Sequence, residues 1–206
     1  MDDLLARWRD LIDDEAAGRE LLARWSEPHR RYHDVEHLRS VLTAVDELGD
    51  EAEDVTAVRL AAWFHDAVYA GRAGEDERAS AAFAAAMLPD LGVDDEQIAE
   101  VVRLVELTAA HEPAADDANG AVLCDGDLAV LGGEPTEYAT YAAAVRAEYA
   151  DVAETDFRSG RIAVLERLLT HQPLYRTATG RQRWEVAARR NIETELTLLR
   201  AGASAS

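Results

Sequence analysis

The stretch "HLRSVLTAVDEL", residues 37–48, sets the period that much of the chain follows. The residues expected on its buried face are His37, Val41, Ala44 and Leu48. Spacings of three and four residues place side chains on one face of an α-helix, whereas a half-buried strand alternates at every second residue. Similar lines occur at 98–105 and 184–199, and no alternating, β-branched stretch favours a sheet. The sequence therefore predicts an all-α protein.

Capping patterns indicate where two of these helices begin. Asp54 is predicted to cap a helix that runs to about Tyr69. Asp94, followed by Gln97 three residues later, indicates a capping box at the start of another helix. Stretches rich in Gly, Pro and acidic residues separate the helical segments at 49–50, 70–76, 112–120 and 132–135. These signals predict roughly eight to ten helices of ordinary length.

The length and composition suit one domain with a sizeable core, because the chain has 206 residues and 48% of them are hydrophobic. None of the breaks has the composition of a domain linker. We therefore expect a single-domain helical bundle over residues 1–200, with N-terminal helices in 1–30 packing on it. The tail "AGASAS", residues 201–206, is predicted to be frayed and disordered.

The charge balance excludes several classes of partner. Asp and Glu total 41 against 21 basic residues, so the formal net charge is -20, and every basic residue is Arg. Such a field repels nucleic-acid backbones and anionic membranes, so neither is expected as a partner. The absence of Lys excludes Schiff-base chemistry and a lysine-based phosphate loop. An anionic small substrate would need a local reversal of charge, from a bound cation or a few arginines.

The N-terminus and the cysteine content bear on the compartment. The stretch "MDDLLARWRDLIDD", residues 1–14, is acidic where a signal peptide is basic. No segment approaches the roughly 20 apolar residues of a membrane span. Cys124 is the only cysteine, which excludes an internal disulfide and a Cys-rich zinc site. These features predict a soluble, cytoplasmic protein and leave its oligomeric state open.

Histidines and aspartates gather in segments that otherwise have the pattern of buried helices. The set consists of His33, His37, His65, Asp66, His111, Asp125 and Asp127. His33 and His37 are four residues apart, so they share a face if both are helical. Asp34 between them is the expected cap of that helix. Asp125 and Asp127 are expected to begin another helix after His111.

Burying these groups is costly unless they bind something. An unpartnered buried carboxylate costs several kcal/mol or shifts its pKa. A divalent cation would remove this cost, and a mixture of imidazole and carboxylate suits Mn, Fe, Co, Ni or Zn better than Mg. The ligands would come from different helices that meet at one end of the core. The alternative for His65 and Asp66 alone is a hydrogen-bonded polar pair at the end of a helix.

The order His … His-Asp … Asp resembles the HD superfamily of metal-dependent phosphohydrolases. Within it, the sequence is most similar to a subgroup of small HD-domain phosphohydrolases, over residues 31–196. The similar segments are "RYHDVEHL" (31–38), "WFHDAVY" (63–69), "EDERASA" (75–81), "LTAAH" (107–111) and "DGDLAVLG" (125–132). The resemblance implies an HD-type helical fold and one metal ion. The implied ligands are His37, His65, Asp66 and Asp127, with Asp125 as the alternative to Asp127 or as its supporting partner.

The same resemblance implies metal-dependent hydrolysis of a phosphate ester or anhydride, with a nucleotide or small phosphomonoester as the substrate. Asp66 or Asp125 would orient or deprotonate the attacking water. His111 or His33 would stabilise the phosphoryl charge or protonate the leaving oxygen. Glu77, in the segment "EDERASA", could reach the site as a further catalytic carboxylate.

Other functions stay open at this point. Residues 67–69 are Ala-Val-Tyr, whereas nucleotidase relatives often carry a glutamate soon after the His-Asp pair. This difference favours a nucleotide-binding or regulatory HD domain that has lost turnover. The surplus histidines would permit a second ion and di-iron, oxygenase-like chemistry. For Arg31 and Arg78, contact with phosphate competes with surface pairing to carboxylates.

Overall fold

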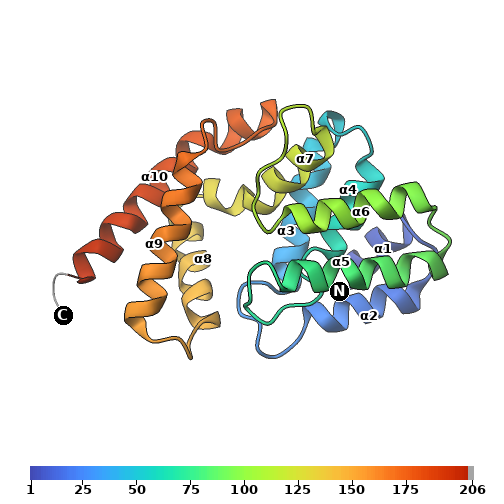
Figure 1. The fold of residues 1–206 in the computed structure, drawn as a ribbon, viewed down its shortest axis with the longest axis horizontal. Helices are drawn as coiled ribbons and strands as arrows, with labels where there is room; N and C mark the ends of the chain where they lie inside the picture. Colours follow the sequence, from blue (N-terminus) through green and yellow to red (C-terminus); the bar gives the residue numbers. More distant parts are fainter. Residues whose placement is uncertain (204–206) are drawn as a thin grey trace. The chain divides into compact units, whose positions relative to one another are not determined.

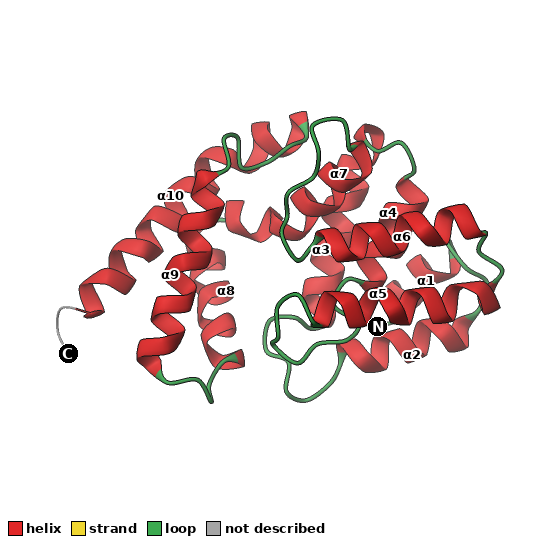
Figure 2. Ribbon diagram, viewed as in Figure 1, coloured by secondary structure: helices red, strands yellow, loops and turns green. Residues whose placement is uncertain are grey.

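Residues 1–203 of the computed structural model are described, and they form helices and loops with no strand (Figure 2). The all-α prediction is confirmed, and the ten α-helices of the described range lie at the upper end of the predicted number. None of the helices in these residues combines the length and the apolar composition that crossing a membrane requires.

The chain divides into two compact units, one ending at Asp127 and the other beginning at Leu128. The first unit (Figure 1) consists of α1 (Asp2–Arg9), α2 (Glu15–Trp25), α3 (Val35–Leu48), η1 (Gly49–Glu51), α4 (Val55–Phe64), α5 (Asp76–Met87), η2 (Leu88–Leu91), α6 (Asp95–Leu107) and α7 (Ala118–Asp127). The second consists of η3 (Leu128–Gly132), α8 (Pro135–Glu148), α9 (Glu154–Thr170) and α10 (Ala178–Ala203). The single domain over 1–200 stays a prediction.

The core of the first unit is built around α3 and α4. These helices contact each other and α7, and α4 also contacts α6, which packs on α5. Trp8, Trp25, Trp63 and Phe64 are fully buried, and the rings of Trp8 and Trp63 meet edge-on with centroids 5.3 Å apart. Large aromatic rings remove much apolar surface from water, so these residues contribute strongly to stability. Trp8 of α1 and Trp25 of α2 attach the N-terminal helices to this core.

Both predicted helix caps are present. The carboxylates of Asp54 and Asp94 each accept a hydrogen bond, 2.9 Å long, from the backbone N–H three residues later. The predicted capping box is incomplete, because the Gln97 side chain donates to Asp54 at 3.2 Å and is not returned to the backbone of Asp94. The Gln97 contact therefore links the starts of α4 and α6, which pack side by side.

The predicted end of α4 near Tyr69 is wrong, because the helix ends at Phe64. The carbonyl groups of Asp66 and Ala67 accept hydrogen bonds from the buried guanidinium of Arg30, at 2.8 and 3.4 Å. The N–H of Ala67 bonds to the carbonyl of Phe64 at 3.0 Å, a tighter turn than the α-helix makes. The His-Asp pair thus lies just beyond the C-terminus of α4.

In the second unit, α10 contacts η3 and α9. The buried face of α10 consists of Trp184, Ala188, Ile192 and Leu196, at the spacing that the sequence predicts. Gly132 approaches α10 closely, because a Cβ added there would lie 2.4 Å from the Cβ of Trp184. α10 extends through Ala203 and so includes part of the tail predicted to be frayed (201–206), while 204–206 lie outside the described residues.

Candidate metal centre

Side chains from three helices of the first unit meet at one buried point. His37 lies in the first turn of α3, His65 directly follows α4, and Asp127 is the last residue of α7. The Nε2 atoms of the two histidines are 3.2 Å apart, and Oδ1 of Asp127 lies 3.1 Å from one and 3.6 Å from the other. One ligand atom from each residue fits within 4.8 Å of the others. This group could hold a metal ion.

The remaining predicted ligand, Asp66, adjoins the same group. Its Oδ2 lies 3.3 Å from Nε2 of His65 and 3.8 Å from Nε2 of His37. Among the described residues, the group that could hold an ion includes Asp127 and not Asp125, although Asp125 is also buried. The expectation that these two aspartates begin a helix is wrong, because α7 ends at Asp127. Residues 118–127 pack as a helix on α3, which places Asp127 beside His37.

Asp34 fixes the start of α3 and thereby the position of His37. Its carboxylate accepts hydrogen bonds from the N–H groups of Glu36 (2.9 Å) and His37 (3.3 Å), as the predicted cap requires. Two backbone donors that the helix leaves without partners are satisfied in this way. His37 therefore lies in a helical turn whose backbone is held in place by the Asp34 carboxylate.

Replacing Asp34 by alanine is expected to lower the free energy of unfolding by about 0.5–2 kcal/mol, because the two N–H groups lose their acceptor. Asp34→Asn keeps an acceptor oxygen and is expected to cost only a few tenths of a kcal/mol. Urea unfolding followed by circular dichroism measures both values. Equal losses for the two variants would show that the cap is not what stabilises this turn.

The His65 imidazole is oriented by the backbone and by a tryptophan ring. Its Nδ1 lies 2.9 Å from the carbonyl oxygen of Ala62, so Nδ1–H donates there and Nε2 faces the cluster. The Trp25 ring lies 5.3 Å from the His65 ring and 6.1 Å from the His37 ring, and its indole N–H donates to the Trp63 carbonyl at 3.0 Å. Sequence patterns did not single out Trp25, because a tryptophan ending an amphipathic helix looks like ordinary core.

Burial and mutual contact shift the pKa values of all four residues. Burial lowers the pKa of His37, which keeps this imidazole neutral near pH 7. Burial also opposes charge on His65, but the Asp66 and Asp127 carboxylates outweigh it and raise its pKa well above 6.5. Burial opposes charge on the carboxyls too, yet His65 lowers the pKa of Asp66 to about 2 and that of Asp127 well below its usual range. Two carboxylates thus face one imidazolium, which leaves one negative charge uncompensated within the four residues.

His111 contacts the other oxygen of the Asp127 carboxylate. Its Nε2 lies 2.7 Å from Oδ2 of Asp127, while Oδ1 faces His37. His111 has φ of 55°, a backbone conformation that costs a non-glycine residue about 1–3 kcal/mol and persists where surrounding contacts hold it. The hydrogen bond to Asp127 is such a contact. His111 is therefore placed to orient Asp127, and its part in catalysis stays a prediction.

His33 lies beside the cluster. Among the described residues, the group that could hold an ion does not include it. Its ring stacks on Tyr69 with centroids 4.4 Å apart and meets the His37 ring edge-on at 5.5 Å. His33 and Tyr69 are both partly exposed. The two residues lie where the buried cluster approaches the surface. A catalytic role for His33 stays a prediction.

Glu77 lies on α5, and the structure explains the segment around it. Its carboxylate accepts a hydrogen bond from the backbone N–H three residues earlier. Asp76 accepts hydrogen bonds from two N–H groups of the loop 70–72, at 2.8 and 2.7 Å, and Ser80 bonds the backbone of Val68. The segment "EDERASA" thus holds the loop that follows the His-Asp pair. The catalytic role of Glu77 stays a prediction.

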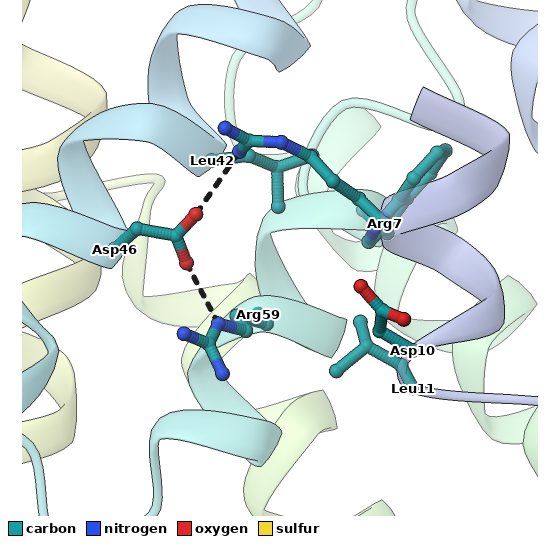
Figure 3. A pocket seen from close by; sticks show the side chains of 7 residues that line it. Arg7, Asp10, Leu11, Leu42, Asp46 and Arg59 are labelled. Atoms are coloured by element: carbon teal, nitrogen blue, oxygen red, sulfur yellow. Dashed lines mark hydrogen bonds and ion pairs between the residues drawn. The ribbon is translucent and has the colours of Figure 1, made fainter. Parts of the chain in front are cut away.

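A pocket lies elsewhere on the first unit, between α1, α3 and α4. Its lining consists of Arg7, Asp10, Leu11, Leu42, Asp46, Arg59 and Trp63, none of which belongs to the His–Asp cluster. Figure 3 shows the Asp46 carboxylate between the guanidinium groups of Arg7 and Arg59, at 3.3 and 2.8 Å. These ion pairs connect three helices, which gives Arg7, Asp46 and Arg59 a structural role.

Comparison with known protein families, with curated proteins and with solved structures returned no match. The family resemblance of the five sequence segments therefore stays a prediction. The geometry of His37, His65 and Asp127, with Asp66 close by, fits a metal ion.

Proposed function

We propose that the first unit binds one divalent metal ion through His37, His65, Asp66 and Asp127, and that the protein hydrolyses a phosphate ester or anhydride. One observation carries this proposal. Two buried imidazole nitrogens and two carboxylates, from α3, the turn that follows α4, and α7, converge at separations of 3.1 to 3.8 Å. The ordered motifs of the sequence, which resemble those of HD phosphohydrolases, add the reaction class to this geometry.

The four residues suit a transition-metal ion in both charge and chemistry. Electron-rich atoms at these separations repel one another unless a proton or a metal cation lies between them. The metal-free cluster carries one uncompensated negative charge. When a divalent ion replaces the His65 proton, the cluster and the ion together are neutral. Neutral imidazole with carboxylate favours Mn, Fe, Co, Ni or Zn over Mg. Elemental analysis measures which metal is bound and how many ions each chain holds.

The residues around the cluster have distinct proposed roles in hydrolysis. A bound divalent ion would lower the pKa of a water ligand and polarise a phosphoryl oxygen. Asp66 would orient the attacking water and accept its proton. His111 would hold the Asp127 carboxylate in place or protonate the leaving oxygen, and the partly exposed His33 would contact the phosphate.

A small phosphorylated substrate, such as a nucleotide or a phosphomonoester, fits the proposal best. The formal charge of -20 opposes polyanionic partners, whereas one local cation permits a small anionic substrate. We expect neither nucleic acid nor a membrane as a partner, and we expect the protein to be soluble and cytoplasmic.

Metal analysis followed by a phosphate-release screen tests the proposal. Purified protein would be analysed for metal, stripped, and reloaded in turn with Mn²⁺, Co²⁺, Ni²⁺ and Mg²⁺. Each form would then be offered nucleoside mono-, di- and triphosphates and small phosphomonoesters. We expect one ion per chain and release of phosphate or pyrophosphate from at least one substrate, with Mg²⁺ the weakest activator. A wild-type protein that binds none of these ions would overturn the proposal.

A second candidate function is nucleotide binding without turnover. The observation that favours it is the position of Glu77, whose carboxylate already accepts a backbone hydrogen bond in the loop before α5. Tight nucleotide binding with no product under any metal would support this function, and clear turnover would exclude it. The third possibility, di-iron oxygenase chemistry, requires two ions per chain and oxygen consumption, so one ion and no oxygen uptake exclude it.

Metal binding is expected to weaken as the pH falls. The metal-free protein holds a proton on His65, whose pKa is raised well above 6.5, and the metal must displace it. His37 has a lowered pKa and Asp66 a pKa of about 2, so neither titrates in the same window. Below the raised pKa, affinity for Co²⁺ should therefore fall about tenfold per pH unit, with about one proton released per ion.

Calorimetric titrations with Co²⁺ in buffers of different ionisation enthalpy measure both the affinity and the proton release. An affinity that is constant from about pH 8 to about pH 6 would contradict the assignment of a displaceable proton to His65.

A further inference from the structure

Arg30 is fully buried beside the proposed metal centre, whereas the sequence patterns pointed only to its neighbour Arg31. The Arg30 side chain has no exposed area, whereas most arginines keep their guanidinium in water. Its Nε and Nη2 pair with the Glu27 carboxylate at 3.1 and 3.0 Å. The guanidinium carbon also lies 5.4 Å from the ring centroids of both Trp25 and Tyr69. Removing a guanidinium from water is costly, so the burial of Arg30 needs a structural explanation.

The remaining donors of Arg30 connect the two chain segments that carry the proposed ligands. Its Nη1 donates to the carbonyl of His33 at 2.9 Å and to the carbonyl of Asp66 at 2.8 Å. Its Nη2 donates more weakly to the carbonyl of Ala67 at 3.4 Å. The first carbonyl lies in the turn that leads into α3 and His37, and the others lie at the end of α4. One guanidinium thus joins both sides of the cluster.

We propose that Arg30 is a positioning residue of the metal centre, which sets the separation between His37 and the His65–Asp66 pair. This inference rests on the proposed function. A planar guanidinium can donate hydrogen bonds in fixed directions to the carbonyls of two chain segments and to a carboxylate at once. An ammonium group cannot do this. The positive charge also lies at the C-terminal end of α4, where a cation is favourable.

The test compares Arg30→Lys and Arg30→Met with a matched control, Arg161→Met. Arg161 is likewise a buried arginine, paired with Glu195 at 2.8 Å, but it lies in the second unit. All three changes are expected to lower thermal stability. Only the Arg30 variants are expected to weaken Co²⁺ binding, roughly 10- to 100-fold by absorption titration, because loss of a supporting contact has effects of this size on metal affinity. Arg30→Lys retains the charge and is the variant expected to stay folded.

A second readout needs no metal. Amide hydrogen exchange in metal-free Arg30→Lys is expected to speed up about tenfold or more in residues 31–37 and 64–70 together, and to stay unchanged there in Arg161→Met. The inference is overturned if Arg30→Lys keeps wild-type exchange in these segments, or if Arg161→Met weakens Co²⁺ binding as much as the Arg30 variants. If the wild type binds no Co²⁺, the proposed function fails, and hydrogen exchange alone then decides whether Arg30 joins the two segments.

Discussion

His65→Ala is expected to reduce metal affinity by more than about a hundredfold, since even loss of a residue that only supports a ligand costs 10- to 100-fold. Phosphate release should fall with the metal content. The physical reason is that His65 Nε2 faces His37, Asp66 and Asp127 at 3.2 to 3.6 Å. Elemental analysis of the purified variant and Co²⁺ titration measure the loss directly.

His171→Ala is the matched control for this variant. His171 follows α9 in the second unit, so its removal deletes the same side chain outside the cluster. We expect wild-type metal content and activity for the control. Asp66→Ala should behave like His65→Ala if Asp66 is a ligand. Full metal content and full activity in both His65→Ala and Asp66→Ala would refute the proposed function.

Trp25→Ala is expected to lower the free energy of unfolding by about 3–5 kcal/mol, the usual cost of removing a fully buried aromatic side chain. The ring has no exposed area and lies beneath the imidazoles of His37 and His65. Its indole N–H also satisfies the carbonyl of Trp63, which would lose its partner in the variant. Urea unfolding of the metal-free protein, followed by circular dichroism, measures the change.

Trp25→Phe separates packing from the hydrogen bond. It retains most of the ring but removes the indole N–H, so a smaller loss of about 1–3 kcal/mol is expected from the unpaired Trp63 carbonyl. Both variants should also weaken Co²⁺ binding, because the ring supports His65. Trp184→Ala, in the second unit, should destabilise the protein without this effect on metal binding. A Trp25→Ala variant within about 1 kcal/mol of the wild type would contradict the role given to Trp25.

Sequence patterns predicted those parts of the structure that depend on neighbouring residues. The helical period gave the all-α fold, and Asp34, Asp54 and Asp94 act as caps because a cap bonds the backbone two or three residues away. His37 and Asp127 also come together as the motif order suggested. Here the prediction relied on resemblance, because spacing alone does not show that segments 90 residues apart in the chain will meet.

The parts that were mispredicted or missed depend on contacts between distant residues. α4 ends at Phe64 and does not resume toward Tyr69, because Arg30, 36 residues before Asp66, takes carbonyls that a longer helix would use. The support of His65 by Trp25 is a similar case, since the Trp25 indole bonds a carbonyl 38 residues away. No local period carries this information. A cation adjoining a His- and Asp-rich motif in so acidic a chain is the one signal that could have pointed to Arg30.

Anomalous diffraction from crystals grown with excess Co²⁺ locates a bound ion directly. We expect one strong anomalous peak within roughly 2.0–2.2 Å of ligand atoms from His37, His65 and Asp127, with Asp66 beside it. Crystals grown in this way that show no peak at the cluster would mean that these residues do not form a metal centre.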